Sequence, residues 1–169
     1  MIKSIKLALA LLVGAILSSP AVAQEMTTEE TRALMTEFLR YHHSGKEEDI
    51  DIWGAYFAED IEARYHTTSP LGVYFFGREG FVNWYKGLAE GVDFSTGMKI
   101  DVWSIVIEGN VAVVRSRNRG RRNGIPWVQE YVHIYTWEDG KIVYMEAFYN
   151  GEATRAYQRL AREAAASGG

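Results

Sequence analysis

The chain has 169 residues, no cysteine, a formal charge of −4 and an aromatic content of 13%. This length suits one domain of ordinary size with its own core. The absence of cysteine excludes a disulfide framework and thiol chemistry, so stability must come from burial, much of it aromatic. The net negative charge makes nucleic acid and anionic membranes poor partners.

The first 23 residues have the pattern of a cleavable signal peptide. Lys3 and Lys6 precede an apolar run at 7–17, and Ala21-Val22-Ala23 has the small-x-small spacing that a signal peptidase reads. The run is about half of the roughly 20 residues needed to cross a bilayer. Cleavage after Ala23 would leave one domain, 24–169, with 16 basic and 22 acidic residues and a formal charge of −6. We therefore expect a periplasmic or secreted protein without membrane attachment after cleavage.

Three helices are predicted in the N-terminal half, because apolar side chains recur there at helical spacing. Their apolar sides are, in chain order, Leu34, Phe38, Tyr41 and His42; Ile50, Trp53, Tyr56 and Phe57; and Phe81, Trp84, Tyr85 and Leu88. Thr27 or Thr28 can cap the first helix, and Asp60 ends the second. A strand at 61–67 and a loop at 69–72 precede the third.

After the third helix the sequence period changes to two. The alternation predicts four long strands at 99–107, 111–119, 127–137 and 141–149, followed by a short helix at about 153–163. Helices followed by a meander favour an α+β fold over a parallel βαβ sheet. We expect a cone-shaped, curved antiparallel or mixed sheet, with the three N-terminal helices on its concave face and a cavity between them.

Four short strings carry a family resemblance. They are FAEDI at 57–61, FGREGF at 76–81, EDGKI at 138–142 and MEAFYN at 145–150. In this order and spacing the chain resembles the nuclear transport factor 2-like superfamily, within it the SnoaL-like and ketosteroid isomerase-like group. The resemblance implies an apolar pocket for a small hydrophobic molecule, no cofactor, and a homodimer formed through the outer face of the sheet. It says little about the reaction, because this fold hosts many.

The catalytic residues of ketosteroid isomerase are not preserved here. The resemblance places Tyr65 where that family has its general-base aspartate, Phe38 where it has a tyrosine donor, and His133 where it has a protonated aspartate. Carboxylate-mediated proton shuttling is therefore not expected. The arginine and two aspartates of limonene-epoxide hydrolases, a sister group, fall on Ser116, Asn118 and Ala147.

His133 and Tyr65 are the candidate catalytic pair. A histidine in an apolar pocket can exchange protons near neutral pH, and a tyrosine beside it could hydrogen-bond a substrate oxygen. The alternative is that His133 is an interior histidine bonded to a tyrosine or a carbonyl. The residues expected to bind the ligand are Phe38, Trp53, Trp84, Tyr135, Met145, Ala147 and Tyr149.

Charged and metal-ligating residues outside this pair are given mostly structural roles. The arginines at 115, 117, 119, 121 and 122 form either an anion site or, as favoured, a polar outer face paired with acids of neighbouring strands. A shift of one residue would instead turn Ser116 and Asn118 toward the pocket. Glu146 is expected on the outer face, paired with an arginine or at a subunit interface. His66 is either solvated or a donor at the pocket rim. No metal is expected, because His42 and His43 are adjacent and lack partners at a ligand spacing.

Two functions remain open on the sequence. The first is a cofactor-free enzyme of isomerase, dehydratase or cyclase type, acting on a small hydrophobic carbonyl or hydroxyl compound. The second is a non-catalytic binding or accessory protein that keeps the pocket.

Overall fold

The computed structural model describes residues 26–66 and 73–167, so the signal peptide and the loop expected at 69–72 lie outside the described residues. The elements are α2 (Thr28–His42), α3 (Asp49–Gly54), β1 (Phe57–His66), β2 (Val73–Phe76), α4 (Arg78–Ala89), η1 (Phe94–Thr96), β3 (Lys99–Glu108), β4 (Val111–Arg122), β5 (Ile125–Glu138), β6 (Lys141–Tyr149) and α5 (Gly151–Ser167). None of these helices is long and apolar enough to span a bilayer.

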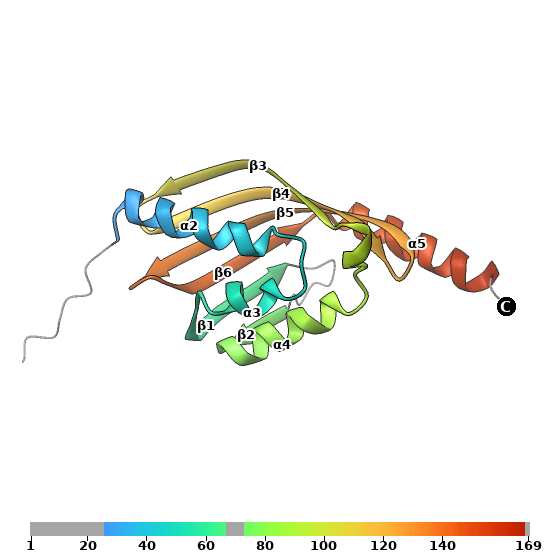
Figure 1. Ribbon diagram of the computed structural model, residues 1–169, viewed down its shortest axis with the longest axis horizontal. Coiled ribbons are helices and arrows are strands. Elements are labelled where there is room, and N and C mark those ends of the chain that lie inside the picture. The colour runs from blue at the N-terminus through green and yellow to red at the C-terminus, as the bar shows by residue number, and fades with distance from the viewer. Residues whose placement is uncertain (1–25, 67–72, 168–169) are drawn as a thin grey trace, which may run out of the picture.

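All six strands belong to one sheet, in the order β2-β1-β6-β5-β4-β3. β1 and β6 run parallel and every other neighbouring pair is antiparallel. Helices α2, α3 and α4 lie on one side of the curved sheet, as Figure 1 shows. The predicted α+β fold with three N-terminal helices on one face is therefore confirmed. We call this side the helix-covered face and the opposite side the bare face.

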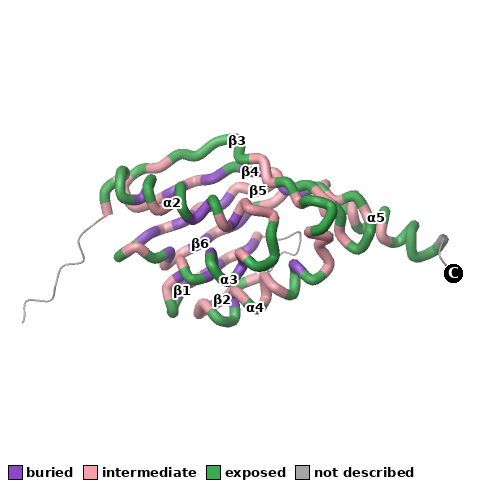
Figure 2. The backbone as a smooth tube through the Cα atoms, in the orientation of Figure 1, coloured by how far each residue is buried: buried purple, intermediate pink, exposed green. Residues whose placement is uncertain are grey.

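The core lies between the helices and the sheet, where Figure 2 shows the buried stretches of the central strands. Phe38 on α2 is fully buried, and its ring contacts those of Trp53, Phe57, Tyr135 and Trp137 at centroid distances of 5.2–6.3 Å. Removal of an aromatic residue from such a site costs about 3–5 kcal/mol. Because the chain has no cysteine to form disulfides, its stability depends on this aromatic packing.

Helix α2 begins where the sequence predicted. Thr27 and Glu30 form a capping box, in which the Thr27 hydroxyl accepts from the Glu30 amide and the Glu30 carboxylate accepts from the Thr27 amide. The Thr28 hydroxyl accepts from the Gly109 amide at 2.9 Å. This bond ties the start of α2 to the turn between β3 and β4.

Several boundaries differ from the prediction. Phe57, expected on the second helix, is the first residue of β1, because the amide of Ile142 on β6 bonds the carbonyl of Tyr56 at 2.8 Å and draws the chain into the sheet. The short strand β2 was not predicted, and α5 is longer at both ends than expected. β4 and β5 continue to a two-residue turn, Asn123-Gly124, in which both residues have positive φ.

The strand register settles which way the arginine run faces. Ser116 and Asn118 are buried on the helix-covered face, whereas Arg115, Arg117 and Arg119 lie on the bare face. The last two of these arginines bond Asp101 on β3. The favoured prediction of a salt-bridged outer face is thus confirmed for this part of the run.

Glu146 lies on the bare face as predicted, but its partner is His66 rather than an arginine. The Glu146 carboxylate lies 2.5 Å from the Nε2 atom of His66, and the His66 ring stacks on Phe148 at 4.3 Å. The alternative of His66 as a pocket-rim donor is therefore wrong. Arg64 lies directly opposite Glu146 in the register, but it bonds Glu62 on its own strand. The Glu146 carboxylate is therefore left to pair with His66.

Candidate functional site

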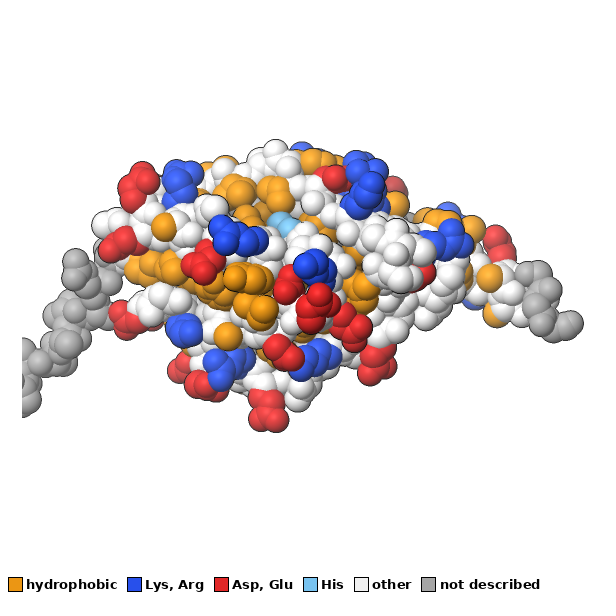
Figure 3. Space-filling model, in the orientation of Figure 1, with side chains coloured by type: hydrophobic (Ala, Val, Ile, Leu, Met, Phe, Trp, Pro, Cys, Tyr) orange, Lys and Arg blue, Asp and Glu red, His pale blue; other side chains and the backbone are white. Residues whose placement is uncertain are grey.

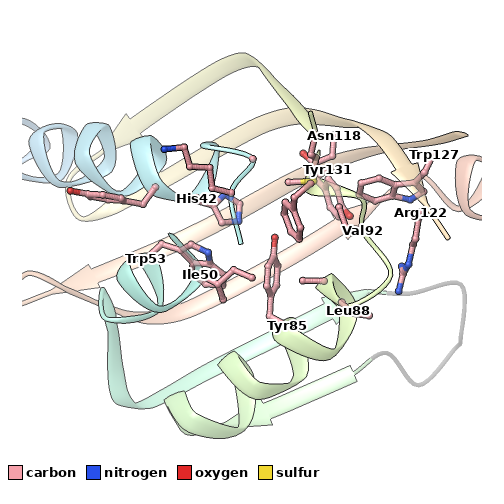
Figure 4. Close-up of a pocket in the computed structure, with 16 residues that line it drawn as sticks. His42, Ile50, Trp53, Tyr85, Leu88, Val92, Asn118, Arg122, Trp127 and Tyr131 are labelled. Atoms are coloured by element: carbon pink, nitrogen blue, oxygen red, sulfur yellow. The ribbon is translucent and has the colours of Figure 1, made fainter. Parts of the chain in front are cut away.

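Two neighbouring hollows that share four lining residues lie on the helix-covered face, and α5 bounds the second of them. The first, about 70 Å³, lies between the end of α2, α3, α4 and the sheet. The second, about 150 Å³, is bounded by α4, α5 and strands β1, β5 and β6. Leu88, Arg122, Trp127 and Tyr131 line both hollows and so form their common wall. Figure 4 shows the first hollow, with the hydroxyl end of Tyr85 directed toward Tyr131.

The strand wall of the site changes from apolar to polar along β4. Its helix-facing positions are, in order, Ala112, Val114, Ser116, Asn118, Gly120 and Arg122. The first two of these are fully buried, and the last lines both hollows. Because side chains alternate along a strand, this single face runs from the core to the mouth of the site.

The opposite wall is aromatic and comes from the helices. Trp53 of α3 and Tyr85 of α4 line the first hollow, with ring centroids 4.7 Å apart in an edge-to-face arrangement. Trp84 of α4 lines the second hollow and packs edge-to-face on Tyr65 at 4.6 Å. Figure 3 views this side of the molecule and shows hydrophobic side chains between the helices, with charged side chains around them.

Helix α5 is fixed at the mouth by a buried glutamine. The Gln129 amide nitrogen donates to the carbonyl of Asn150 at 3.1 Å, and its oxygen accepts from the Thr154 hydroxyl at 2.9 Å. The Tyr157 hydroxyl donates to the carbonyl of Arg122 at 3.4 Å. The start of α5 is thereby held against the ends of β4 and β5, where it forms part of the second hollow.

His133 is buried on the helix-covered face. Its ring stacks between those of Tyr131 and Tyr135 at 5.1 and 5.7 Å and meets the His42 ring edge-on at 5.8 Å. Burial, with a smaller effect of His43, lowers the pKa of His133 to about 3. The side chain is therefore neutral at physiological pH.

Tyr65 lies on the same face as His133, two strands away. Tyr65 is opposite Ala147, and Ala147 is opposite His133, so only a methyl side chain separates them on the sheet surface. Burial first, and then the neighbouring tyrosines 85, 135, 131 and 149, raise the pKa of Tyr65 well above its usual value of 10. Its hydroxyl thus stays protonated and can donate a hydrogen bond.

Four buried polar atoms of this region have no hydrogen-bond partner among the described residues. They are Ser116 Oγ, His42 Nδ1, His133 Nδ1 and Tyr135 Oη. An unpaired buried donor or acceptor costs about 1–3 kcal/mol, and native folds keep few of them. Of these four residues His42 lines the first hollow, so its unpaired nitrogen is the one that a bound molecule or water there would pair.

The residues predicted to bind ligand divide into two sets. Trp53 lines the first hollow, and Trp84 and Tyr149 line the second together with Tyr65. The others, Phe38, Tyr135, Met145 and Ala147, belong to the buried core. Met145, Ala147 and Tyr149 do share the helix-covered face, as their alternation implied.

The sequence did not single out the common wall. Arg122 was hidden in an arginine run, and Leu88 was assigned only to the apolar side of a helix. The signal that could have found Arg122 is parity, because it is six residues from Ser116 and therefore on the same face. Within 26–66 and 73–167 no group of three histidine or carboxylate side chains is arranged to hold a metal ion.

Comparison with known proteins gives a domain family and a fold. The profile of the SnoaL-like domain matches residues 38–145. No curated protein matches the sequence. A putative SnoaL-like polyketide cyclase from Jannaschia sp. CCS1 is 20% identical, with a TM-score of 0.60 over 74% of this chain and 91% of the other.

Two further solved structures have the same fold. An NTF2-like protein from Anabaena variabilis ATCC 29413 is 14% identical, with a TM-score of 0.63 over 73% of this chain and 91% of the other. TerC, co-crystallised with polyporic acid, is 18% identical, with a TM-score of 0.60 over 75% of this chain and 96% of the other. At these identities the likeness establishes the fold, which is the one that the four short strings implied.

Proposed function

Because this chain belongs to the SnoaL-like domain family, we propose that its two neighbouring hollows bind one small, largely apolar molecule that carries hydrogen-bonding groups. The observation that carries this proposal is the contrast between the walls. Aromatic rings of α3 and α4 face a strand wall that ends in Asn118 and Arg122. Small-molecule sites typically combine an apolar lining with a few polar groups that fix orientation.

The unpaired polar atoms and the structural neighbours support this proposal. His42 lines the first hollow and holds an unpaired ring nitrogen, which a ligand oxygen or an ordered water would pair. TerC, which has this fold, was co-crystallised with polyporic acid. We extend the uptake of an organic compound to the present chain as part of the proposal.

Native mass spectrometry of the protein, purified without denaturation, tests for a bound molecule. The proposal predicts a discrete added mass that is lost when the same sample is denatured. A chain that carries no added mass, and whose thermal unfolding is unmoved by any member of a library of small aromatic carbonyl and hydroxyl compounds, would contradict it.

A second candidate is a cofactor-free reaction of isomerase, dehydratase or cyclase type, with His133 as acid/base and Tyr65 as hydrogen-bond donor. It is favoured by the placement of both side chains on one face with Ala147 between them. A pKa of about 3 argues against it, because a base this weak is poorly matched to proton transfer at neutral pH. We therefore place binding before catalysis.

The His133→Ala variant decides between the two when a compound that binds is found. If that compound turns over and the variant keeps the wild-type rate, His133 has no catalytic role. A rate that falls while the affinity for the compound stays unchanged would support the catalytic candidate instead.

We also propose that the protein is exported and cleaved after Ala23. The proposal is based on the sequence pattern of residues 1–23 alone. Intact mass measurement of protein recovered from the periplasm or medium of a bacterium that expresses the full chain should give a species beginning at Gln24. Recovery of the uncleaved chain from the cytoplasm would contradict export.

Finally, we propose a homodimer formed through the bare face. The apolar side chains of Val106, Val128 and Phe148 on this face are 40–65% exposed. They lie among charges of both signs, including Arg115 and Glu146. Such a surface can complement a second copy of itself about a two-fold axis.

A further inference from the structure

Arg122 lies at the junction of the two hollows. It is the last residue of β4 and lines both hollows. Figure 4 shows its side chain among those that line the first hollow. Its charge also acts on Tyr131, another residue of the common wall, because it opposes the rise in the pKa of Tyr131 that burial causes. The positive charge of the Arg122 guanidinium therefore acts on the residues that line the hollows.

The backbone around Arg122 is paired with the segment that follows α4. Arg122 pairs with Val92 in an isolated bridge, and the Asn123 amide donates to the carbonyl of Gly91 at 2.7 Å. A Cβ atom at Gly91 would lie only 3.1 Å from the Arg122 Nε atom. Glycine at this position thus leaves the room that the Arg122 side chain occupies.

No acid in the site balances this cation. Every residue that lines the two hollows is apolar, aromatic, neutral polar or basic, so the described lining contains no carboxylate. The ion pairs among the described residues engage the arginines of the bare face and of α2, β1 and α4, but leave Arg122 out.

We propose that Arg122 is the counter-ion for an anionic group on the bound molecule, which is therefore an aromatic acid: a carboxylate, a sulfonate or an ionised enol or phenol on a flat apolar frame. This inference rests on the proposed binding function and specifies its ligand class. A guanidinium is always charged and presents a planar set of donors that matches an oxyanion. The rings of the common wall receive the apolar frame, and Arg122 receives the charge.

The test uses two fluorescent probes with the same ring system. 1-Anilinonaphthalene-8-sulfonate is anionic, and 1-anilinonaphthalene is its neutral counterpart. Fluorescence titrations at pH 7.5 and low salt should give the wild-type protein a tighter Kd for the sulfonate. Arg122→Gln should weaken sulfonate binding about tenfold or more and change the Kd of the neutral probe less than twofold, because only the charge-assisted contact is lost. The sulfonate Kd of Arg122→Lys should lie between those of the wild type and Arg122→Gln, because lysine keeps the positive charge but lacks the planar set of donors.

Arg115→Gln is the matched control, because it removes the same charge from the same strand on the opposite face. It should leave both affinities unchanged. The inference is overturned if Arg122→Gln weakens both probes equally, if it weakens neither, or if Arg115→Gln reproduces its effect. Wild-type protein that binds the neutral probe as tightly as the sulfonate overturns the ligand class alone and leaves the binding function standing. Failure of both probes to bind the wild type overturns the binding function and the ligand class together.

Discussion

The side chain of His133 combines deep burial with an unpaired ring nitrogen. Among the described residues its Nδ1 atom has no partner, and the surrounding rings of Tyr131, Tyr135 and His42 offer little solvation. The same surroundings that keep it neutral make it a weak base. We therefore expect its main measurable effect to be on the pH dependence of stability.

Acid should destabilise the fold through His133. In the unfolded chain its pKa is about 6.5, and in the folded chain it is about 3. Between these values the unfolded state binds the proton and the folded state does not, so the free energy of unfolding falls as the pH is lowered. The slope is about 1.4 kcal/mol per pH unit for one such histidine. His133→Gln should show a correspondingly shallower decline in urea-unfolding free energy between pH 6 and 4.5; a decline as steep as that of the wild type would contradict the burial account.

Strand parity explains which residues of the site could be predicted. The resemblance to ketosteroid isomerase assigned Tyr65 and His133 to one pocket, and they do lie on one face because the register of β1, β6 and β5 carries no bulge between them. Arg122 was missed because five arginines in eight residues hide the change of face between Arg121 and Arg122. The spacing puts Arg122 on the same face as Ser116, but only the pairing of β4 with β5 shows that this is the helix-covered face, and pairing partners are not encoded locally.

The connection between α2 and α3 lies against the start of β3 and helps to form the first hollow. Gly45 in this connection has a φ of 71° and lines the hollow. A Cβ atom there would overlap the backbone carbonyl oxygen of Met98. The connection therefore needs glycine for two reasons, the backbone conformation and the close approach of another backbone.

Gly45→Ala should destabilise the protein by about 3 kcal/mol, because strain at positive φ adds to the steric overlap. The matched control is Gly97→Ala, whose φ of 78° imposes the same conformational cost but whose Cβ would meet no atom within 4 Å. This control should cost about 1 kcal/mol. Equal losses of unfolding free energy for the two variants in urea would show that the α2–α3 connection does not pack on β3 as described.

At the scale of elements, long periodic segments were predictable and short or shared ones were not. The three helical stripes and four long strands were found from their periods. Phe57 was assigned to a helix because it continues the spacing from Trp53, but pairing with β6 takes it into a strand. The four residues of β2 are too few to establish a period, and their strand form depends on pairing with β1.

For the whole molecule, the two faces of the sheet have different roles. The helix-covered face supplies the core and the hollows, while the bare face carries exposed apolar side chains between paired charges. Phe148 lies near the middle of the bare face, on β6 between β1 and β5. A second copy of the chain would bury it.

Phe148→Glu should convert the proposed dimer to a monomer, because the charge would be desolvated at the interface. The control is Ile52→Glu on α3, at a position of similar exposure, 44% against 40%. Light scattering after size exclusion should show a dimer for the wild type and for the control. A wild-type monomer at micromolar concentration, or a Phe148→Glu variant that remains dimeric, would refute the proposed interface.

The central claim is that the hollows bind a small molecule, and Leu88 gives the most direct test because it lines both hollows. Leu88→Trp should fill their junction, whereas Leu160→Trp makes the same change at a similarly exposed leucine of α5, 44% against 37% exposed. Titration with 1-anilinonaphthalene should give the wild type and Leu160→Trp the same Kd, and should give Leu88→Trp a Kd at least about tenfold weaker. Equal affinities for all three proteins, or no binding by the wild type, would contradict the account.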